Sequence, residues 1–370
     1  MIEVPHPGEF LAEELECRGW SQRDLAYILG VSEQGITQIV NGRRGISPEM
    51  AKALGDAFDV NPEFFTNLQK AYDLSRAKEP DPGIARRAQF QSVYPIREMI
   101  RRGWLEDTDV PMLEGQLMRF FHTNDISSIP HLAHAAKKKS YDVDTPEQLA
   151  WLYRVRQISS EIVVPRYSKK ALEEVIKDQL PALMTDPEEV RHVPRLLAEC
   201  GIRFAIVEHL DKTHIDGVCF WDSGQPVVAM TTRFDRIDNF WFVLWHELTH
   251  VLNEDGKKKG TRERVDANLK YEISDDLPPE EKRANKAAAD ACVPIREMDS
   301  FYARKAPYIS EKDVLGFARR IKRHPGIVVG QLQYRMDRYN WLPKYKVAVR
   351  KFIAQSAVMD GWGNPAPVSL

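Results

Sequence analysis

Apolar residues recur at helical spacing through most of the chain. Short helical segments follow one another up to about residue 78, and the same spacing returns from Ile84 to about Gly201. It returns once more after Met230 and continues to about Lys351. A period near 3.6 residues is that of a helix with one buried face. The pattern therefore predicts a mostly helical protein.

One stretch departs from this spacing and is typical of β-strands. It holds runs of β-branched and aromatic residues, and Asp222-Ser223-Gly224-Gln225 between the last two runs is typical of a tight turn. The predicted strands are 202–207, 217–221 and 226–230. We expect a small antiparallel sheet just before the most apolar helix, and hence an α+β fold that is mostly α.

Proline and glycine place the clearest break in the helical pattern after Lys78. Pro80, Pro82 and Gly83 follow that residue, and such residues do not continue a helix. A chain of 370 residues is also long enough for two or three domains. We expect an N-terminal domain over 1–78, a helical connecting region over 79–149, a further domain over 150–350 and a loose C-terminal tail over 351–370.

The composition is that of a soluble globular protein. Hydrophobic residues make up 43% of the chain and charged residues 29%, and the longest apolar run, 240–245, is far shorter than the roughly 18–20 residues that span a bilayer. The N-terminus lacks a signal-peptide pattern, so we expect a cytoplasmic protein without a membrane partner. Cys17, Cys200, Cys219 and Cys292 are scattered, which argues against a disulfide framework or a cysteine-bound zinc.

Residues 21–41 carry the pattern of two short helices joined at a turn. Ser21 and Ser32 stand where they would cap the two helices, and Gly30 supplies the positive φ that the turn needs. The residues expected to fill the angle between the helices are Val31, Ile36 and Ile39. The second helix presents a polar face of Glu33, Gln34, Gly35 and Gln38, which is surrounded by Gln22, Arg23, Asn41, Arg43 and Arg44.

Such a face suits the major groove of double-stranded DNA. Glutamine pairs with adenine through two hydrogen bonds, glutamate accepts from cytosine, and glycine lets the backbone approach closely. The surrounding polar and basic side chains are suited to phosphates. Residues 1–79 nevertheless have a net charge of −5, which opposes phosphate binding. An ordinary pair of packed helices with a polar surface is the alternative.

Two further motifs frame this pair of helices. His6-Pro7-Gly8-Glu9-Phe10-Leu11 precedes it, and Pro62-Glu63-Phe64-Phe65 begins a segment that runs to Leu74 after it. The pair of helices resembles the helix-turn-helix of Cro and phage repressors, and with the two framing motifs residues 5–78 resemble HigA-type antitoxins. The resemblance implies a five-helix operator-binding module that represses its own operon and neutralises a cognate toxin. We expect a homodimer, because two half-sites one helical turn apart need two recognition helices.

A second motif lies in the most apolar predicted helix, 238–253. It contains His246-Glu247-Leu248-Thr249-His250, and histidines four residues apart project from the same side of a helix. Both imidazoles can therefore reach one tetrahedral Zn²⁺, with Glu247 beside them and directed to the metal's water. The alternative is an accidental match, with two structural histidines and a surface glutamate.

A catalytic zinc takes three protein ligands, so a third is needed. A new helix is predicted over 278–290, after a proline stop. One face of it carries Glu281, Ala284, Asn285 and Ala288. Glu281 is the predicted third ligand and Glu280 its nearest competitor. Both glutamates could instead simply stabilise the N-terminus of the helix.

This second half also resembles a known family. The Glu-x-x-Ala-Asn helix runs on to Val293-Pro294, and His324-Pro325-Gly326-Ile327 opens a later shared segment, so that residues 150–345 resemble the ImmA/IrrE family of zinc metallopeptidases. The resemblance implies His246, His250 and Glu281 as zinc ligands, Glu247 as the general base and Asn285 as a partner behind the ligands. Its substrates would be proteins such as repressors or antitoxins. Candidates to stabilise the oxyanion are His209, His214, Tyr271 and His324.

Three functional interpretations follow. The leading one is a DNA-binding regulator of antitoxin type with a zinc-dependent peptidase domain, in which operator binding and proteolysis or sensing are coupled. The second is a HigA-like antitoxin and autorepressor whose zincin domain binds a toxin or ligand without cleaving it. The third and least favoured is a housekeeping peptidase whose helix-turn-helix makes only protein contacts.

Overall fold

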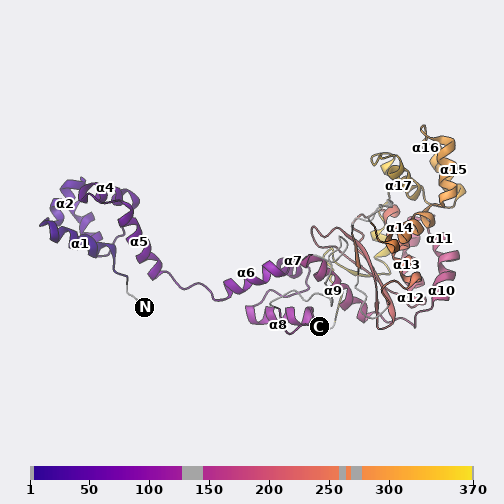
Figure 1. Cartoon of the computed structure of the whole chain (residues 1–370), viewed down its shortest axis with the longest axis horizontal. Coiled ribbons are helices and arrows are strands. Elements are labelled where there is room, and N and C mark those ends of the chain that lie inside the picture. The colour runs from indigo at the N-terminus through magenta and orange to yellow at the C-terminus, as the bar shows by residue number, and fades with distance from the viewer. Residues whose placement is uncertain (1–3, 127–144, 258–263, 268–276, 369–370) are drawn as a thin grey trace. The chain divides into compact units, whose positions relative to one another are not determined.

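The chain forms two compact units. The computed structural model describes residues 4–126, 145–257, 264–267 and 277–368. The first unit is Met1–Pro82 and the second is Gly83–Leu370 (Figure 1). Within the described ranges, no helix combines the length and the apolar character needed to cross a bilayer.

The first unit is the five-helix domain that the sequence predicts. Its described helices are α1 (Pro7–Arg18), α2 (Gln22–Leu29), α3 (Glu33–Val40), α4 (Pro48–Phe58) and α5 (Glu63–Arg76). The predicted caps are confirmed, because the Ser21 hydroxyl accepts from the Asp24 N–H and the Ser32 hydroxyl from the Gly35 N–H. Gly30 ends α2 with a φ of +65°, the left-handed conformation that glycine adopts without strain.

One prediction about the core of this unit is wrong. Ile36 and Ile39 are buried between the helices, as expected, but Val31 is 39% exposed. Val31 follows the left-handed Gly30 and precedes the cap of α3, so it lies in the turn outside the helical repeat. The core between the helices is filled instead by residues from different helices, among them Leu11, Leu54 and Phe65. Sequence spacing within one helix does not predict which of these residues meet.

The second unit is built around a five-stranded sheet. Its strands are β1 (Arg203–Val207), β2 (Ile215–Asp222), β3 (Gln225–Met230), β4 (Arg264–Ala267) and β5 (Val358–Asp360), in the order β4-β2-β3-β1-β5. The predicted hairpin is confirmed, since β2 and β3 pair antiparallel. Ser223 and Gly224 join these strands, both with positive φ, as a tight hairpin turn requires.

The sheet is mixed, and not antiparallel as we expected. β1 runs parallel to β3 and to β5. It pairs with the far strand of the hairpin, Gln225–Met230, which runs in the same direction because the chain reverses twice between them. Side-chain alternation is the same in parallel and antiparallel strands, so the sequence pattern could not decide the direction.

Helices cover both faces of this sheet. Residues of β1 alternate between two cores: Phe204 and Ile206 face one, and Ala205 and Val207 face the other. The described helices on the N-terminal side are α6 (Gly83–Val93), α7 (Ile96–Arg101), α8 (Val110–Phe120) and α9 (Pro146–Glu161). They pack on the face of Ala205 and Val207. The boundary expected at residue 150 falls inside α9, and the expected connecting region shares a core with the sheet.

The other face of the sheet is covered by α10–α12, which precede β1, and by the helices that follow β3. α13 (Ile237–Asn253) contributes most of the buried aromatic residues of this core. The remaining helices of the described residues are α10 (Lys169–Glu174), η1 (Val175–Gln179), α11 (Leu180–Leu183), η2 (Pro187–His192), α12 (Val193–Glu199), α14 (Pro279–Cys292), α15 (Ile295–Lys305), α16 (Glu311–Arg320), α17 (Pro325–Arg335), η3 (Pro343–Tyr345) and α18 (Arg350–Ile353). The mostly α, α+β fold is therefore confirmed.

The expected loose tail is instead part of this fold. Residues 351–370 include the end of α18 and all of β5. Asp360 at the end of β5 is fully buried and forms an ion pair of 2.8 Å with Arg154 of α9. It also accepts a hydrogen bond of 2.7 Å from Trp104 Nε1. A short strand with few apolar residues carries no repeating pattern, which is why the sequence did not reveal it.

Candidate metal centre and nucleic-acid interface

The His-Glu-x-x-His motif lies in the last two turns of α13. The helix follows the predicted boundaries closely, because its apolar residues, such as Trp241, Leu244 and Leu248, are buried in the core. It ends where Glu254 adopts a left-handed conformation with a φ of +55°. His246 and His250 are therefore one turn apart on a rigid element.

Three donor atoms from two helices meet at this motif. Nε2 of His246 lies 3.0 Å from Nε2 of His250. Oε2 of Glu281, on α14, lies 3.2 Å from the first nitrogen and 3.5 Å from the second. All three side chains are buried. Among the described residues, they form a group of the kind that could hold a metal ion.

The outer nitrogen of each imidazole has a fixed partner. Nδ1 of His246 lies 3.0 Å from Oδ1 of Asn285, and Nδ1 of His250 lies 2.9 Å from Oδ2 of Asp255. Amide and carboxylate oxygens accept but do not donate, so each Nδ1 carries the proton. Nε2 of each neutral imidazole is then an electron-pair donor. Two such nitrogens and one carboxylate oxygen are a donor set that fits Zn²⁺.

The structure separates the two competing glutamates. α14 approaches α13 through Ala284 and Ala288, both of which are fully buried. Glu281 lies on the same face and joins the histidines, whereas the group does not include Glu280. Burial would raise the pKa of the Glu281 carboxyl, but hydrogen bonds from His246 and His250, and the charge of these rings when they are protonated, hold that pKa below its usual range. Glu281 is therefore ionised, as a metal ligand must be.

Glu247 is fully buried beside these donors. Its carboxylate lies against Gly217 of β2, where a β-carbon would overlap it. Gly217 also stands at an irregularity in the pairing of β2 with β4. A glycine inside a strand often marks such a close approach. The motif is thus packed against the strand as well as against α14.

Sequence reasoning missed the partner of His250. Asp255 lies two residues after the end of α13, and its carboxylate also accepts from Nη2 of Arg283 at 2.9 and 3.0 Å. Burial would raise the pKa of the Asp255 carboxyl, but His250 and Arg283 hold it below its usual range. The signal available in the sequence was weak: an aspartate five residues after the second histidine, beyond the helical pattern.

The four oxyanion candidates have different surroundings. His214 is exposed, and its Nδ1 lies 3.0 Å from Nη1 of Arg233. His324 caps α17 by accepting from the Gly326 N–H, and burial lowers its pKa. The pKa of His209 is lowered mainly by burial, and the positive charges of Arg233 and Arg102 lower it further. Tyr271 lies outside the described residues. An oxyanion role for any of them stays a prediction.

The predicted DNA-contacting residues are distributed around α3. Gly35 and Gln38 are half-buried on α3, and Gln22 is half-buried at the start of α2. The exposed members of the set are Arg23, Glu33, Gln34, Asn41, Arg43 and Arg44. The side chain of Gln22 accepts a hydrogen bond of 2.7 Å from the Thr37 hydroxyl, which ties the start of α2 to α3.

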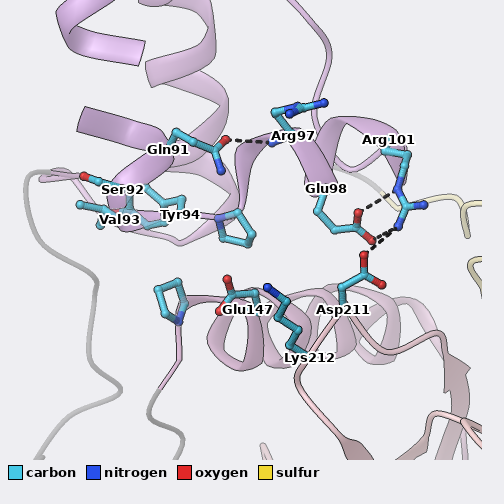
Figure 2. Close-up of a pocket in the computed structure, with 12 residues that line it drawn as sticks. Gln91, Ser92, Val93, Tyr94, Arg97, Glu98, Arg101, Glu147, Asp211 and Lys212 are labelled. Atoms are coloured by element: carbon cyan, nitrogen blue, oxygen red, sulfur yellow. Dashed lines mark hydrogen bonds and ion pairs between the residues drawn. The ribbon is translucent and has the colours of Figure 1, made fainter. Parts of the chain in front are cut away.

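A separate pocket of about 700 Å³ lies elsewhere in the second unit. Figure 2 shows it between α7, the start of α9 and the loop that follows β1. Its charged lining consists of Arg97, Glu98, Arg101, Glu147, Asp211 and Lys212. Within it, Arg101 donates to Glu98 at 2.7 Å and lies 3.9 Å from Asp211. The pocket shares no residue with the His246 group, and its balanced charge selects no single ligand class.

Comparison with known proteins identifies relatives of the N-terminal part. The family model described as helix-turn-helix matches residues 11–65. Virulence-associated protein A' of Dichelobacter nodosus is 41% identical over 80 residues, which are 21% of this chain and 70% of that protein. Virulence-associated protein I of the same organism is 40% identical over 85 residues, 22% of this chain and 79% of that protein.

A transcriptional regulator and two solved structures are similar to the same N-terminal fifth of the chain. The HTH-type transcriptional regulator YddM of Escherichia coli K12 is 28% identical over 79 residues, 21% of this chain and 84% of that protein. The structure of a HigA-family addiction module antidote protein from Coxiella burnetii is 42% identical, with a TM-score of 0.19 over 20% of this chain and 80% of that one. Pseudomonas aeruginosa antitoxin HigA, solved with the higBA promoter, is 42% identical over 20% of this chain and 79% of that one, also with a TM-score of 0.19.

Proposed function

Because the chain belongs, through its N-terminal unit, to the helix-turn-helix family, we propose that it is a DNA-binding transcriptional regulator of antitoxin type that carries a zinc-dependent peptidase site in its second unit. The proposed partners are double-stranded operator DNA, a second copy of the chain and a protein substrate such as a repressor or antitoxin. The two units would couple operator binding to proteolysis.

One observation carries the peptidase part of this proposal. Nε2 of His246, Nε2 of His250 and Oε2 of Glu281 converge within 3.5 Å of one another. Both imidazoles are oriented by hydrogen-bond partners at Nδ1. In zinc sites, a partner at the nitrogen that does not bind the metal sets the orientation of the ring and the position of its proton. These three residues would hold the zinc ion, and the resemblance to ImmA/IrrE metallopeptidases assigns them the same role.

The chemistry that the zinc ion supplies is Lewis-acid polarisation of the scissile carbonyl. Glu247 would take the proton of the attacking water and later pass it to the leaving amine, as a general base and acid. The carboxylate lies against Gly217 on β2, where a β-carbon would overlap it. Asn285 keeps the His246 ring in the orientation that this arrangement needs.

The regulatory part of the proposal rests on α3. Gln34 and Glu33 are exposed at its first turn, where a recognition helix contacts base edges in the major groove. Arg43 and Arg44 follow the helix and are exposed as well, so they can reach phosphates on either side. A homodimer would place two copies of α3 in successive major grooves.

Metal content tests the zinc site most directly. The full-length chain is purified without chelator, and zinc per chain is measured by elemental analysis for the wild type, His250→Ala and His192→Ala. We expect close to one zinc per chain in the wild type and in His192→Ala, because the His192 side chain on η2 is 40% exposed and is not part of the group, and close to none in His250→Ala. Equal zinc in all three proteins would contradict the site.

Cleavage is tested separately from metal binding. The wild type and Glu247→Gln are loaded with zinc and incubated with a peptide library made from bacterial proteome, and new N-termini are identified by mass spectrometry. We expect cleavage by the wild type and its loss in Glu247→Gln at unchanged zinc content, because glutamine cannot accept the proton. Equal cleavage by both would rule out Glu247 as the base.

One observation favours a second function. His246 and Glu247 are fully buried, so a substrate reaches them only after neighbouring residues move. A chain that keeps this site closed would act as an antitoxin and autorepressor whose second unit binds a toxin or ligand without cleaving it. In that case the wild type binds zinc and leaves the library intact, and Glu247→Gln represses as well as the wild type.

A further inference from the structure

We propose that Asp255 is a positioning residue of the metal centre, held by Arg283 and Trp221 so that it orients the His250 imidazole toward His246 and Glu281. This inference rests on the zinc site proposed above and adds three residues to it. None of the three belongs to the His-Glu-x-x-His motif or to the predicted ligands.

The end of α13 brings Asp255 back to His250. The left-handed Glu254 reverses the chain after Asn253, and the Asp255 N–H donates to the His250 carbonyl at 3.0 Å. Oδ2 of Asp255 then lies 2.9 Å from Nδ1 of His250. Because the carboxylate can only accept, the proton stays on Nδ1 and the Nε2 lone pair is directed to the other donors.

Arg283 links this carboxylate to the second metal-binding helix. Its Nη2 lies 2.9 and 3.0 Å from the two oxygens of Asp255. Arg283 follows Glu281 by two residues on α14. A movement of α14 that displaced Glu281 would therefore also pull on Asp255. The ion pair thus joins α14 to the turn that follows α13.

Trp221 holds the backbone of Asp255 in place. Its Nε1 donates to the Asp255 carbonyl at 3.0 Å, and the next residue, Gly256, has a φ of +77° that the turn requires. Trp221 lies on β2, the strand whose Gly217 packs against Glu247. Asp255 is therefore tied to α13, α14 and β2, the three elements that surround the site.

The two imidazoles are oriented by chemically different partners. His246 is held by the neutral amide of Asn285, whereas His250 is held by a carboxylate that is itself paired with a cation. A carboxylate at Nδ1 increases the electron-donating strength of the opposite nitrogen more than an amide does. Asp255 should therefore affect the metal affinity through His250 alone and leave the His246 ring in place.

The test uses the full-length chain with four sequences: the wild type, Asp255→Ala, Asp255→Asn and Glu254→Gln. Zinc affinity is measured by competition with a chromophoric chelator. Long-range ¹H–¹⁵N NMR of the metal-free chains reports which nitrogen of His246 and of His250 carries the proton. Glu254→Gln is the matched control, because it removes a neighbouring exposed carboxylate that pairs with Lys257 and not with His250.

We expect zinc affinity to fall by about 10–100-fold in Asp255→Ala, by less in Asp255→Asn and not at all in Glu254→Gln. The His250 proton should leave its fixed place on Nδ1 in Asp255→Ala, while the His246 signals stay unchanged and show that the fold is intact. Wild-type affinity in Asp255→Ala would overturn the positioning role.

The metal-free spectra separate this inference from the zinc proposal. If the wild type binds no zinc, the zinc site fails, and the inference is then decided by NMR alone. A proton fixed on Nδ1 of His250 in the wild type and released in Asp255→Ala supports it. The same spectrum in both proteins, or a simultaneous change at His246, overturns it.

Discussion

Gly217 on β2 lies against Glu247 on α13, and a β-carbon on this glycine would overlap Oε1 of that carboxylate and lie 3.0 Å from its Cδ. The same β-carbon would lie 3.1 Å from Cγ1 of Val243 on α13. The position of Glu247 thus depends on a residue 30 positions earlier in the chain.

The first prediction concerns this contact. Gly217→Ala should lower the free energy of unfolding by about 1–3 kcal/mol, the usual cost of overpacking a core. It should also displace Glu247 and abolish any cleavage while zinc content stays near that of the wild type. Urea unfolding and elemental analysis measure the two effects.

Gly316→Ala on α16 is the matched control, because a β-carbon there meets nothing within 4 Å. It should leave stability unchanged or raise it by up to about 1 kcal/mol, as alanine does in a helix. If Gly217→Ala were as stable and as active as this control, the contact with Glu247 would not matter.

The second prediction concerns the buried pair Arg154–Asp360. Asp360→Ala removes the ion pair and two hydrogen bonds, from Trp104 Nε1 and from the Ala366 N–H. Leaving Arg154 buried without its counter-charge should cost about 3–5 kcal/mol. Unfolding can be followed by tryptophan fluorescence, because seven of the eight tryptophans lie in the second unit.

The exposed pair Arg195–Glu199, also 2.8 Å long, is the control. Glu199→Ala should change stability by no more than about 1 kcal/mol, since exposed pairs are weak. If both variants lost the same free energy of unfolding, burial would not determine how much the Arg154–Asp360 pair contributes to stability.

The third prediction concerns DNA recognition by α3. A duplex is first enriched by the wild type from a random-sequence library, and binding is measured by fluorescence anisotropy. Gln34→Ala and Gln38→Ala should each weaken binding to this duplex by about 1–3 kcal/mol, because in the proposed interface each glutamine would pair with a base. Binding to random DNA should be almost unchanged.

Arg43→Ala should act differently from the glutamines. It should weaken binding to both DNAs alike and reduce the slope of affinity against salt by about 1, as expected for one phosphate contact. Lys70→Ala on α5, outside the helix-turn-helix, serves as the control. Failure of the wild type to enrich any duplex would count against the regulatory proposal.

The fourth prediction concerns alkaline pH. Tyr94 is buried, and its phenol has a pKa raised to about 12. Burial is the largest cause, and the nearby Asp125 and Tyr153 add to it. The phenol of an unfolded chain has a pKa of about 10. Between these values only the unfolded state loses the proton, so the stability present below pH ~10 is lost as the pH rises.

Tyr94→Phe removes this dependence. The stability of the wild type relative to this variant should therefore fall steadily from pH ~10 to pH ~12, as measured by urea unfolding. Tyr27→Phe is the control, because Tyr27 is 88% exposed and its replacement should make no pH-dependent difference. A constant difference between the wild type and Tyr94→Phe would contradict the raised pKa.

The sequence predicted the three members of the candidate metal-binding group, and the structure brings them together. His246 and His250 share one helix, so their spacing alone places them on one side. Helical spacing also favours Glu281 over its neighbour Glu280, because Glu281 shares a face with Ala284 and Ala288. The choice depends on which face of α14 meets α13, and the buried Ala284 and Ala288 decide it.

Other features of the site had no signal in the sequence. Asp255 follows the helix, and it reaches His250 only because Glu254 turns the chain back. Gly217 meets Glu247 through the packing of a strand on a helix. Neither contact involves a regular spacing, so neither could be predicted from the pattern of residues.

By itself the sequence determined the short helices of the N-terminal domain with the turn between α2 and α3, the hairpin of β2 and β3 and the two histidines on α13. These features depend on spacing and turn residues within one or two adjacent elements, where geometry is local. Only the tertiary structure decided the parallel pairing of β1, the burial of Asp360 and the approach of Asp255 to His250. The first two depend on the packing of elements far apart in the chain, and the third depends on the left-handed turn at Glu254, so no local repeat records them.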